Sequence, residues 1–497
     1  MTASNVSAEH GGTQPRTPSL ADAIIPLISL AVLIAGSLIL FGLDALDGPI
    51  QVALVLCCAV AALIVLKNGH SWEDIQSAGQ VAMMSVTSAV FILLAVGALI
   101  GTWNLSGTIP TLVYYGIQVL SPSWYYAAAA IICALVALSI GSSWTTAGTV
   151  GVGLIGIATM LDVSPAITAG AVISGAYLGD KTSPLSETTI LTAQMVGVNP
   201  YEHIKRQVWT SVPAFGIALI TFFVLGFIRT PDPNASVVTE TDLDALGEHF
   251  WINPVNLLPL VLLAVMSVKK VPASLALLSS ALFAGVLAAF TQPDLVAEFV
   301  GGAGNVVTES IKAMWQAMAT GFHMSTGVSD VDRLVSRGGM DSMLLTLWLI
   351  FGAVTFGTIL EKFGLITRLI DPMIASAHST GRLFVTVFAC GFGLNVVAGD
   401  QYIALVLPAR IFRVEFAKRG LAPTNLSRLA ADSGTVTSPL VPWNSCGAFM
   451  GATLGVSTLL YLPYAVFCYA SPILSVLYGV TGFKIERIDP VLEGESA

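Results

Sequence analysis

The chain has 497 residues, of which 55% are hydrophobic and only 10% are charged. An ordinary soluble domain carries about 25% charged residues, so this composition excludes a soluble globular protein. Asp and Glu (30) outnumber Lys and Arg (21), so the chain lacks the basic surface that nucleic-acid binding requires. We therefore expect membrane lipid, and no nucleic acid, as the environment of most of the chain.

Long apolar runs predict an all-α protein with many membrane crossings. Residues 1–20 are polar and predict a disordered tail, and residues 21–79 hold the first spans, beginning with the apolar stretch from Asp22 to Leu43. Several later apolar pieces are shorter than the ~20 residues that a full crossing needs. We therefore predict about 11 to 13 crossings, with some helices broken or re-entrant.

The distribution of basic residues predicts the orientation in the membrane. Lys and Arg in short loops are retained on the cytoplasmic side. They occur at Lys67, Lys205 and Lys269, whereas residues 231–250 are acidic. Both termini are therefore predicted to be cytoplasmic, and 231–250 is predicted to be an external loop.

Short motifs recur at a constant distance. Ser183-Pro184-Leu185 returns as Ser438-Pro439-Leu440, 255 residues later, and Gly97-Ala98 returns as Gly352-Ala353 at the same distance. Duplicated halves with interrupted hydrophobic segments are typical of secondary transporters, in which inverted repeats enclose the binding site. We therefore predict two inverted repeats, 80–230 and 335–480. A connecting segment with extra spans, 231–334, joins them, and 481–497 is predicted to be a cytoplasmic tail.

The densest polar stretch inside apolar sequence is 179–189, which reads GDKTSPLSETT. Pro184 disfavours helical geometry at Ser183 and suits the first turn of a new helix. We therefore expect one helix to end near Asp180 and another to begin at Pro184, with Ser183 as its N-cap. Such a break places carboxylates, hydroxyls and free carbonyls together, and hard cations such as sodium prefer these oxygen ligands.

Other polar interruptions extend the candidate site. The matching stretch 431–445 has the same Ser-Pro break but no acid after it, and Asp400 lies between apolar segments. Asp400 has a structural alternative, an ion pair with Arg410 or Arg413. The candidates are three carboxylates for sodium or protons (Asp180, Glu187 and Asp400) and seven neutral ligands (Ser142, Thr146, Ser183, Thr188, Asn395, Ser438 and Asn444).

Two basic residues lie at or after the first break, and the sequence predicts where each of them lies. Lys181 would oppose proton uptake by a neighbouring carboxylate if it pointed inward. We expect it to reach the membrane interface or to pair with an acid. His203, beside Lys205, is expected on the cytoplasmic surface.

Four separated strings resemble a known family. GDKTSPLSETT, GSSWTTAGTVG at 141–151, SRGGMDSM at 336–343 and GDQYIALVLPARIF at 399–412 are similar to NhaC-type sodium/proton antiporters of the bacterial cytoplasmic membrane, within the ion transporter superfamily. The resemblance implies a multi-pass protein that exchanges sodium, or lithium, for protons and serves pH homeostasis. It also includes relatives that exchange malate with protons for lactate with sodium. No cofactor is implied, and a homodimer is left open.

The predicted mechanism is competition of sodium and protons for the same carboxylates. A carboxyl group removed from water keeps its proton at higher pH than one in water, so the two ions can exclude each other at neutral pH. A carboxylate exchanger is the alternative, with the anion at Ser183, Ser438 and Arg410 or Arg428. An intramembrane aspartyl protease would need GxGD, but positions 177 and 397 are Tyr and Val. We therefore do not expect an enzyme.

Overall fold

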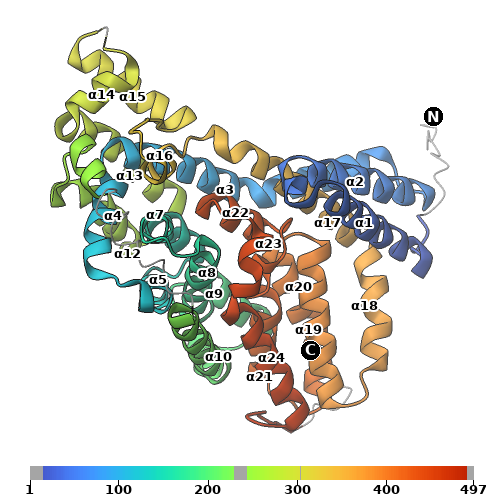
Figure 1. Ribbon diagram of the computed structural model, residues 1–497. Helices are drawn as coiled ribbons and strands as arrows, with labels where there is room; N and C mark the ends of the chain where they lie inside the picture. The colour runs from blue at the N-terminus through green and yellow to red at the C-terminus, as the bar shows by residue number, and fades with distance from the viewer. Residues whose placement is uncertain (1–14, 229–242, 303, 490–497) are drawn as a thin grey trace, which may run out of the picture.

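The computed structural model describes residues 15–228, 243–302 and 304–489. Within these ranges all regular secondary structure is helical, and β pairing is limited to two isolated bridges. Figure 1 shows the helices in one continuous assembly, with the first helices along one edge and the last ones at its centre. The all-α prediction is confirmed. Much of the predicted tails and of the acidic loop 231–250 lies outside the described residues.

Eight helical segments of the described residues are long and apolar enough to span a bilayer. They are Leu20–Asp47 (with α1, Leu20–Phe41), α2 (Pro49–Lys67), α3 (Trp72–Leu105), Pro122–Ile140 (with α5, Tyr125–Ile140), α10 (Pro200–Ile228), α13 (Ala273–Thr291), Asp341–Lys362 (with α17, Leu344–Lys362) and α19 (Thr380–Val397). Two pairs of helices would raise the number to ten if each pair is one span, namely Leu243–His249 with Pro254–Val268, bent by 92°, and Ser445–Leu454 with Thr458–Tyr464, bent by 93°. The prediction of 11 to 13 exceeds this number, because the helices beside the breaks are too short or too polar to count as crossings on their own.

Shorter helices fill the space between the spans. They are α4 (Thr108–Val119), α6 (Ser143–Thr146), α7 (Val152–Met160), α8 (Pro165–Thr182), α9 (Glu187–Val196), α12 (Leu258–Val268), α14 (Pro293–Val300), α15 (Val306–Thr320), α16 (Ser329–Val335), α18 (Leu365–Ser376), α20 (Gln401–Lys418), α21 (Pro423–Ala430), α22 (Ser445–Leu454), α23 (Thr458–Tyr461) and α24 (Val466–Thr481). Two π-helical turns, η3 (Ala147–Gly151) and η6 (Ala431–Thr435), continue α6 and α21.

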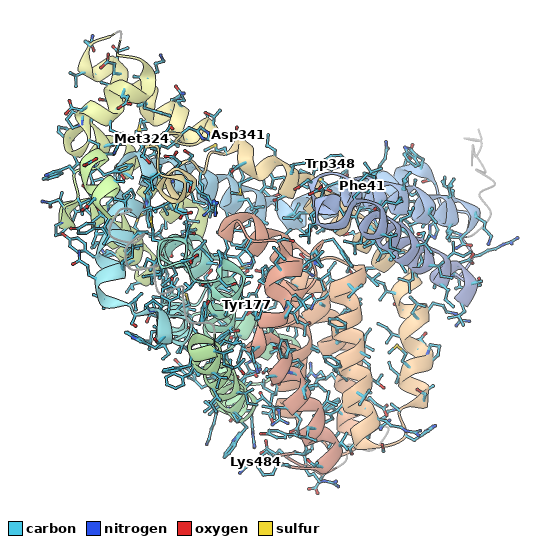
Figure 2. All side chains as sticks on the ribbon, viewed as in Figure 1. Phe41, Tyr177, Met324, Asp341, Trp348 and Lys484 are labelled. Carbon is cyan, nitrogen blue, oxygen red and sulfur yellow. The ribbon has the colours of Figure 1, made fainter. Side chains whose placement is uncertain are left out.

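Large apolar side chains cover the outside of the spans. Ile39 on α1 is 83% exposed and Ile220 on α10 is 68% exposed, whereas Phe222 on the other side of α10 is fully buried. Figure 2 labels two further exposed apolar side chains, Phe41 and Trp348. Contiguous apolar surface of this extent is stable against lipid and unstable in water. The prediction of a multi-pass membrane protein is confirmed.

The two predicted repeats have parallel orders of elements. α5, α6, α8 and α9 in the first half match α19, α20, α21 and α22 in the second, and each half has its Ser-Pro break between the last two. Gly141 and Gly399 adopt positive φ before α6 and α20, and Gly197 and Gly455 do so after α9 and α22. Both glycine pairs are separated by 258 residues. The opposed orientation of the repeats and their boundaries remain predictions.

Candidate functional site

Asp180 is the most enclosed carboxylate of the first break. It lies in the last turn of α8 and accepts hydrogen bonds from three hydroxyl groups. Ser143 donates to Oδ2 at 2.6 Å, while Ser186 and Thr188 donate to Oδ1 at 2.7 and 3.1 Å. The side chain is buried, so its charge is stabilised by these hydroxyl dipoles and not by bulk water.

The hydroxyls that contact Asp180 differ in part from the predicted ones. Of the predicted hydroxyls, Thr188 contacts Asp180, whereas Ser142 caps α6 and Ser183 donates to the backbone carbonyl of Leu138 at 2.8 Å. Ser183 is the C-cap of α8, and Ser186 is the N-cap of α9. The predicted start at Pro184 was therefore wrong by three residues, because residues between the two caps form a turn. The pattern Ser-Glu-Thr-Thr, with an acid in the first turn, was the signal for Ser186.

Close approach of two backbone segments brings α6 to the break. Gly141 has φ +79°, and a Cβ atom there would lie 2.6 Å from the carbonyl carbon of Leu185. Only glycine combines this conformation with this approach. The cap of α6 can therefore place Ser143 beside Asp180.

All three predicted carboxylates line one cavity of about 510 Å³. Asp180, Glu187 and Asp400 share it with Ser142 and Thr188, so five of the ten predicted residues lie on its wall. The wall is built from α3, α6, the α8–α9 break, the loop between α12 and α13, and the starts of α20 and α22. Both halves of the chain and the connecting segment therefore meet at this cavity.

Asp400 lies at a helix start and not inside a helix. It is the N-cap of α20, and its Oδ1 accepts from the backbone N–H groups of Tyr402 and Ile403 at 2.8 and 3.0 Å. Among the described residues no ion pair joins it to Arg410 or Arg413, so the structural alternative of a pair with these arginines was wrong. Its charge is stabilised instead by the helix N-terminus.

The remaining predicted ligands lie behind the cavity wall. The side-chain amide of Asn444 donates to that of Asn395 at 3.0 Å, which ties α19 to the start of α22. Ser438 donates to Gln401 at 3.3 Å, and Gln401 lines the cavity. Thr146 donates to the backbone carbonyl of Ser142 at 2.8 Å. These residues support the wall and do not contact the cavity in this conformation.

A buried ion pair, not among the predicted site residues, joins the two halves. Lys181, directly after Asp180, pairs with Asp432 of η6, and both side chains are fully buried. The ammonium also donates to Thr210 at 3.1 Å and Ser471 at 2.8 Å. The expectation that Lys181 pairs with an acid is confirmed. Asp432 was not among the predicted site residues, because it precedes the Ser-Pro motif of the second break, whereas Glu187 of the first break follows its motif.

His203 corrects another expectation. It is fully buried in α10 and lies 3.2 Å from the amide nitrogen of Gln207. The surface location expected from its basic sequence neighbours was wrong, because Lys205 lies on a different face of the same helix.

The site lies inside the assembly. Figure 2 places Tyr177, three residues before Asp180, near the middle of the assembly.

Broken helices from two halves of a membrane protein, meeting at a cavity lined with carboxylates and hydroxyls, are the architecture of secondary transporters. A sequence profile described as the Na+/H+ antiporter family matches residues 7–208 and 175–483. The chain belongs to this family.

Curated relatives match along nearly the whole chain. The Na(+)/H(+) antiporter NhaC of Alkalihalophilus pseudofirmus is 35% identical over 93% of this chain and 96% of the relative. The malate-2H(+)/Na(+)-lactate antiporter of Bacillus subtilis is 33% identical over 94% of this chain and 96% of the relative. The arginine/ornithine antiporter ArcD of Halobacterium salinarum is 32% identical over 96% and 94%, respectively.

Proposed function

We propose that this protein exchanges sodium for protons across the bacterial cytoplasmic membrane, with Asp180 as the group for which the two ions compete. The observation that carries the proposal is the buried Asp180 carboxylate, which has three hydroxyl partners and lines the cavity between the halves. Carboxylate and hydroxyl oxygens match the ligand preference of a hard monovalent cation. The relative named as the Na(+)/H(+) antiporter NhaC supports the same exchange.

Hydroxyl groups suit both states of such a site. A Ser or Thr hydroxyl has one donor and two acceptor lone pairs and can rotate between partners. With Asp180 ionised and no cation bound, the hydroxyls of Ser143, Ser186 and Thr188 can all donate to it, since each lies within hydrogen-bond distance. With sodium bound, their oxygens face the ion, and with a proton bound, Asp180 donates to one of them. Each state satisfies the buried oxygens, so exchange does not require an unpaired charge.

Glu187 and Asp400 supply further negative charge on the cavity wall. A cation in the cavity is therefore surrounded by carboxylates from both halves of the chain. Since Asp400 is stabilised by backbone N–H groups of α20, we assign it to attracting and orienting the cation. Both termini are proposed to be cytoplasmic.

Carboxylate exchange is the second candidate, favoured by the malate and lactate relative. The predicted anion anchors do not line the cavity, since neither Arg410 nor Arg428 contributes to its wall. Ser183 does not start a helix, and Lys270 is the one basic residue among the described lining residues. The sodium and proton exchange is therefore the better-supported proposal.

The test is transport in sealed vesicles that contain purified protein and a pH-sensitive dye. Sodium addition should release protons through the wild type, and Asp180→Asn should abolish this signal. Glu73→Gln, which changes an exposed acid at the start of α3, is the matched control and should transport normally. Lithium, lactate and malate are added in parallel. Normal sodium-dependent proton movement in folded Asp180→Asn would refute the assignment, and a signal that requires lactate or malate would favour the second candidate.

A further inference from the structure

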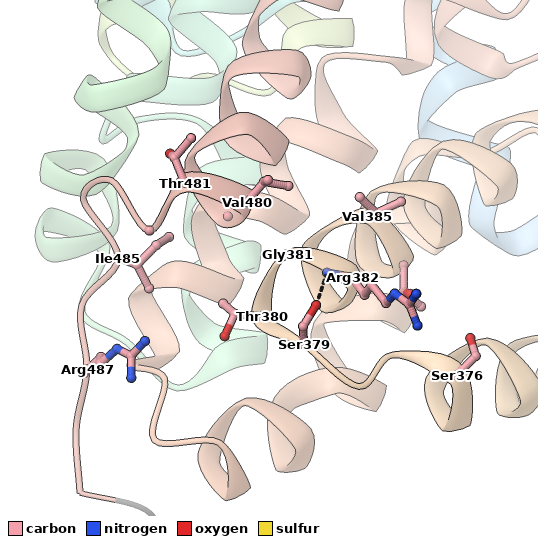
Figure 3. A pocket seen from close by; sticks show the side chains of 13 residues that line it. Ser376, Ser379, Thr380, Gly381, Arg382, Val385, Val480, Thr481, Ile485 and Arg487 are labelled. Carbon is pink, nitrogen blue, oxygen red and sulfur yellow. Dashed lines mark hydrogen bonds between the residues drawn. The ribbon is translucent and has the colours of Figure 1, made fainter.

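A second hollow lies at the opposite side of the second repeat from the carboxylate cavity. It has a volume of about 760 Å³ and is formed by the end of α18, the start of α19, the end of α24 and the chain that follows α24. None of its lining residues belongs to the carboxylate cavity. In Figure 3, Arg487 lies on one side and Arg382 on the other, with Thr380 and Ser379 between them.

The two arginines leave this hollow positively charged. Arg382 and Arg487 are both exposed, and no ion pair of either is found among the described residues. Neighbouring arginines are neutralised, since Arg419 pairs with Glu415 and the guanidinium of Arg206 pairs with an acid near the C-terminus. The guanidinium groups of Arg382 and Arg487 are therefore available to bind an anion in this hollow. Guanidinium groups bind phosphate by charge-assisted, often bidentate, hydrogen bonds.

The hollow lies where two apolar helices, α19 and α24, begin and end. α19 is a membrane span that begins here, and the apolar helix α24 ends here. The ammonium of Lys484 lies 3.9 Å from the ring centre of Trp209, and Trp is enriched where hydrocarbon meets headgroups. The rim toward the membrane is apolar, because Val385 is 46% exposed and Val480 63% exposed. A ligand here would meet two cations at one end and hydrocarbon-compatible surface at the other.

We infer that this hollow binds an anionic phospholipid, with its phosphate between Arg382 and Arg487 and its acyl chains along Val385 and Val480. A free phosphate would use only the arginines, and a zwitterionic lipid would bring its own cation to them. Anionic lipids gather in the cytoplasmic leaflet, and basic pockets between spans are suited to their headgroups. Gly482, at φ +75° with open space where a Cβ would lie, leaves room for the headgroup.

The test measures lipid binding to the purified full-length protein in a neutral detergent. Thermal unfolding is followed while phosphatidylglycerol, phosphatidylcholine or inorganic phosphate is added, and native mass spectrometry counts bound lipids. Phosphatidylglycerol should raise the unfolding temperature in a saturable way, whereas the other two should not at equal concentration. Arg382→Gln/Arg487→Gln should weaken its binding about 30-fold. This change corresponds to a binding free energy of about 1 kcal/mol for each arginine near an anionic lipid surface.

Matched substitutions separate this site from general surface charge. Lys269→Gln/Arg333→Gln removes two exposed positive charges elsewhere and should leave phosphatidylglycerol binding unchanged. The single variants Arg382→Gln and Arg487→Gln provide the answer if the double variant does not fold. Equal stabilisation by phosphatidylcholine, full stabilisation by inorganic phosphate alone, or undiminished lipid binding in the arginine variants would each overturn the inference.

Discussion

The Lys181–Asp432 pair yields the sharpest prediction for stability. Replacing Lys181 by Met removes the ion-pair partner of a fully buried carboxylate and leaves it the hydroxyls of Thr210 and Ser471 as hydrogen-bond partners. An isolated buried charge is costly because neither water nor a counter-ion stabilises it, and breaking a buried pair typically costs about 3 to 5 kcal/mol. We therefore expect Lys181→Met to lower the free energy of unfolding by about 3 to 5 kcal/mol.

An ion pair of the same chemistry whose lysine is exposed is the control. Lys67 pairs with Asp22 at 2.7 Å, but its side chain is 67% exposed, so Lys67→Met should cost less than about 1 kcal/mol. Lys181→Met/Asp432→Asn removes both buried charges and should recover most of the loss, because an amide can still accept from the two hydroxyls.

The measurement is denaturant unfolding in micelles, followed by tryptophan fluorescence, for the wild type and all four variants, including Asp432→Asn. A double-mutant cycle then isolates the coupling of Lys181 to Asp432. A cost of Lys181→Met no larger than that of Lys67→Met would refute the reasoning. Additive losses in the double variant would do so as well, since they would show that the two charges do not stabilise each other.

Three further outcomes are expected. Asp400→Asn should change the free energy of unfolding by less than about 0.5 kcal/mol, because Asn and Asp cap helices equally well, whereas Asp400→Ala should cost about 1 kcal/mol. Both variants should reduce sodium-dependent proton movement. Normal transport in either variant would show that Asp400 takes no part in cation binding. Ser143→Ala and Ser186→Ala should each raise the sodium concentration for half-maximal exchange about tenfold, which corresponds to the lower range for a hydrogen bond to a charged group; a sodium titration in vesicles checks this, and unchanged values would contradict the hydroxyl assignment. The backbone N–H and hydroxyl of Thr326 hold the pKa of Asp332, which lies outside the spans, below its ordinary value of 3.8. The contribution of Asp332 to stability is therefore present above pH 3.8 and is lost as the pH falls through the lowered pKa. Hydrogen exchange of this segment should lose protection on acidification in the wild type but not in Asp332→Asn, and identical acid profiles of the two proteins would contradict this prediction.

Helix breaks were predicted correctly where their cause lies in residues next to each other in the chain. Pro184 interrupts helical hydrogen bonding at its own position, so a break near it followed from the sequence. The exact helix start did not follow, because both Ser183 and Ser186 can cap a helix, and the packing of Ser183 against α5 decided between them. The same limit applies to Asp400, whose role as a cap depends on the turn at Gly399.

The sequence by itself determined that this protein lies in a membrane, that its helices break at polar motifs, and that Asp180, Glu187 and Asp400 are carboxylates in an apolar setting. These properties follow from composition and from residues close together in the chain. Only the tertiary structure decided that Asp400 shares a cavity with Asp180 and that Lys181 is neutralised by Asp432. Such partners are more than 200 residues apart, and no periodicity relates them. Their proximity arises from how the two sets of broken helices pack, since each buried charge is stable only where another segment supplies its partner.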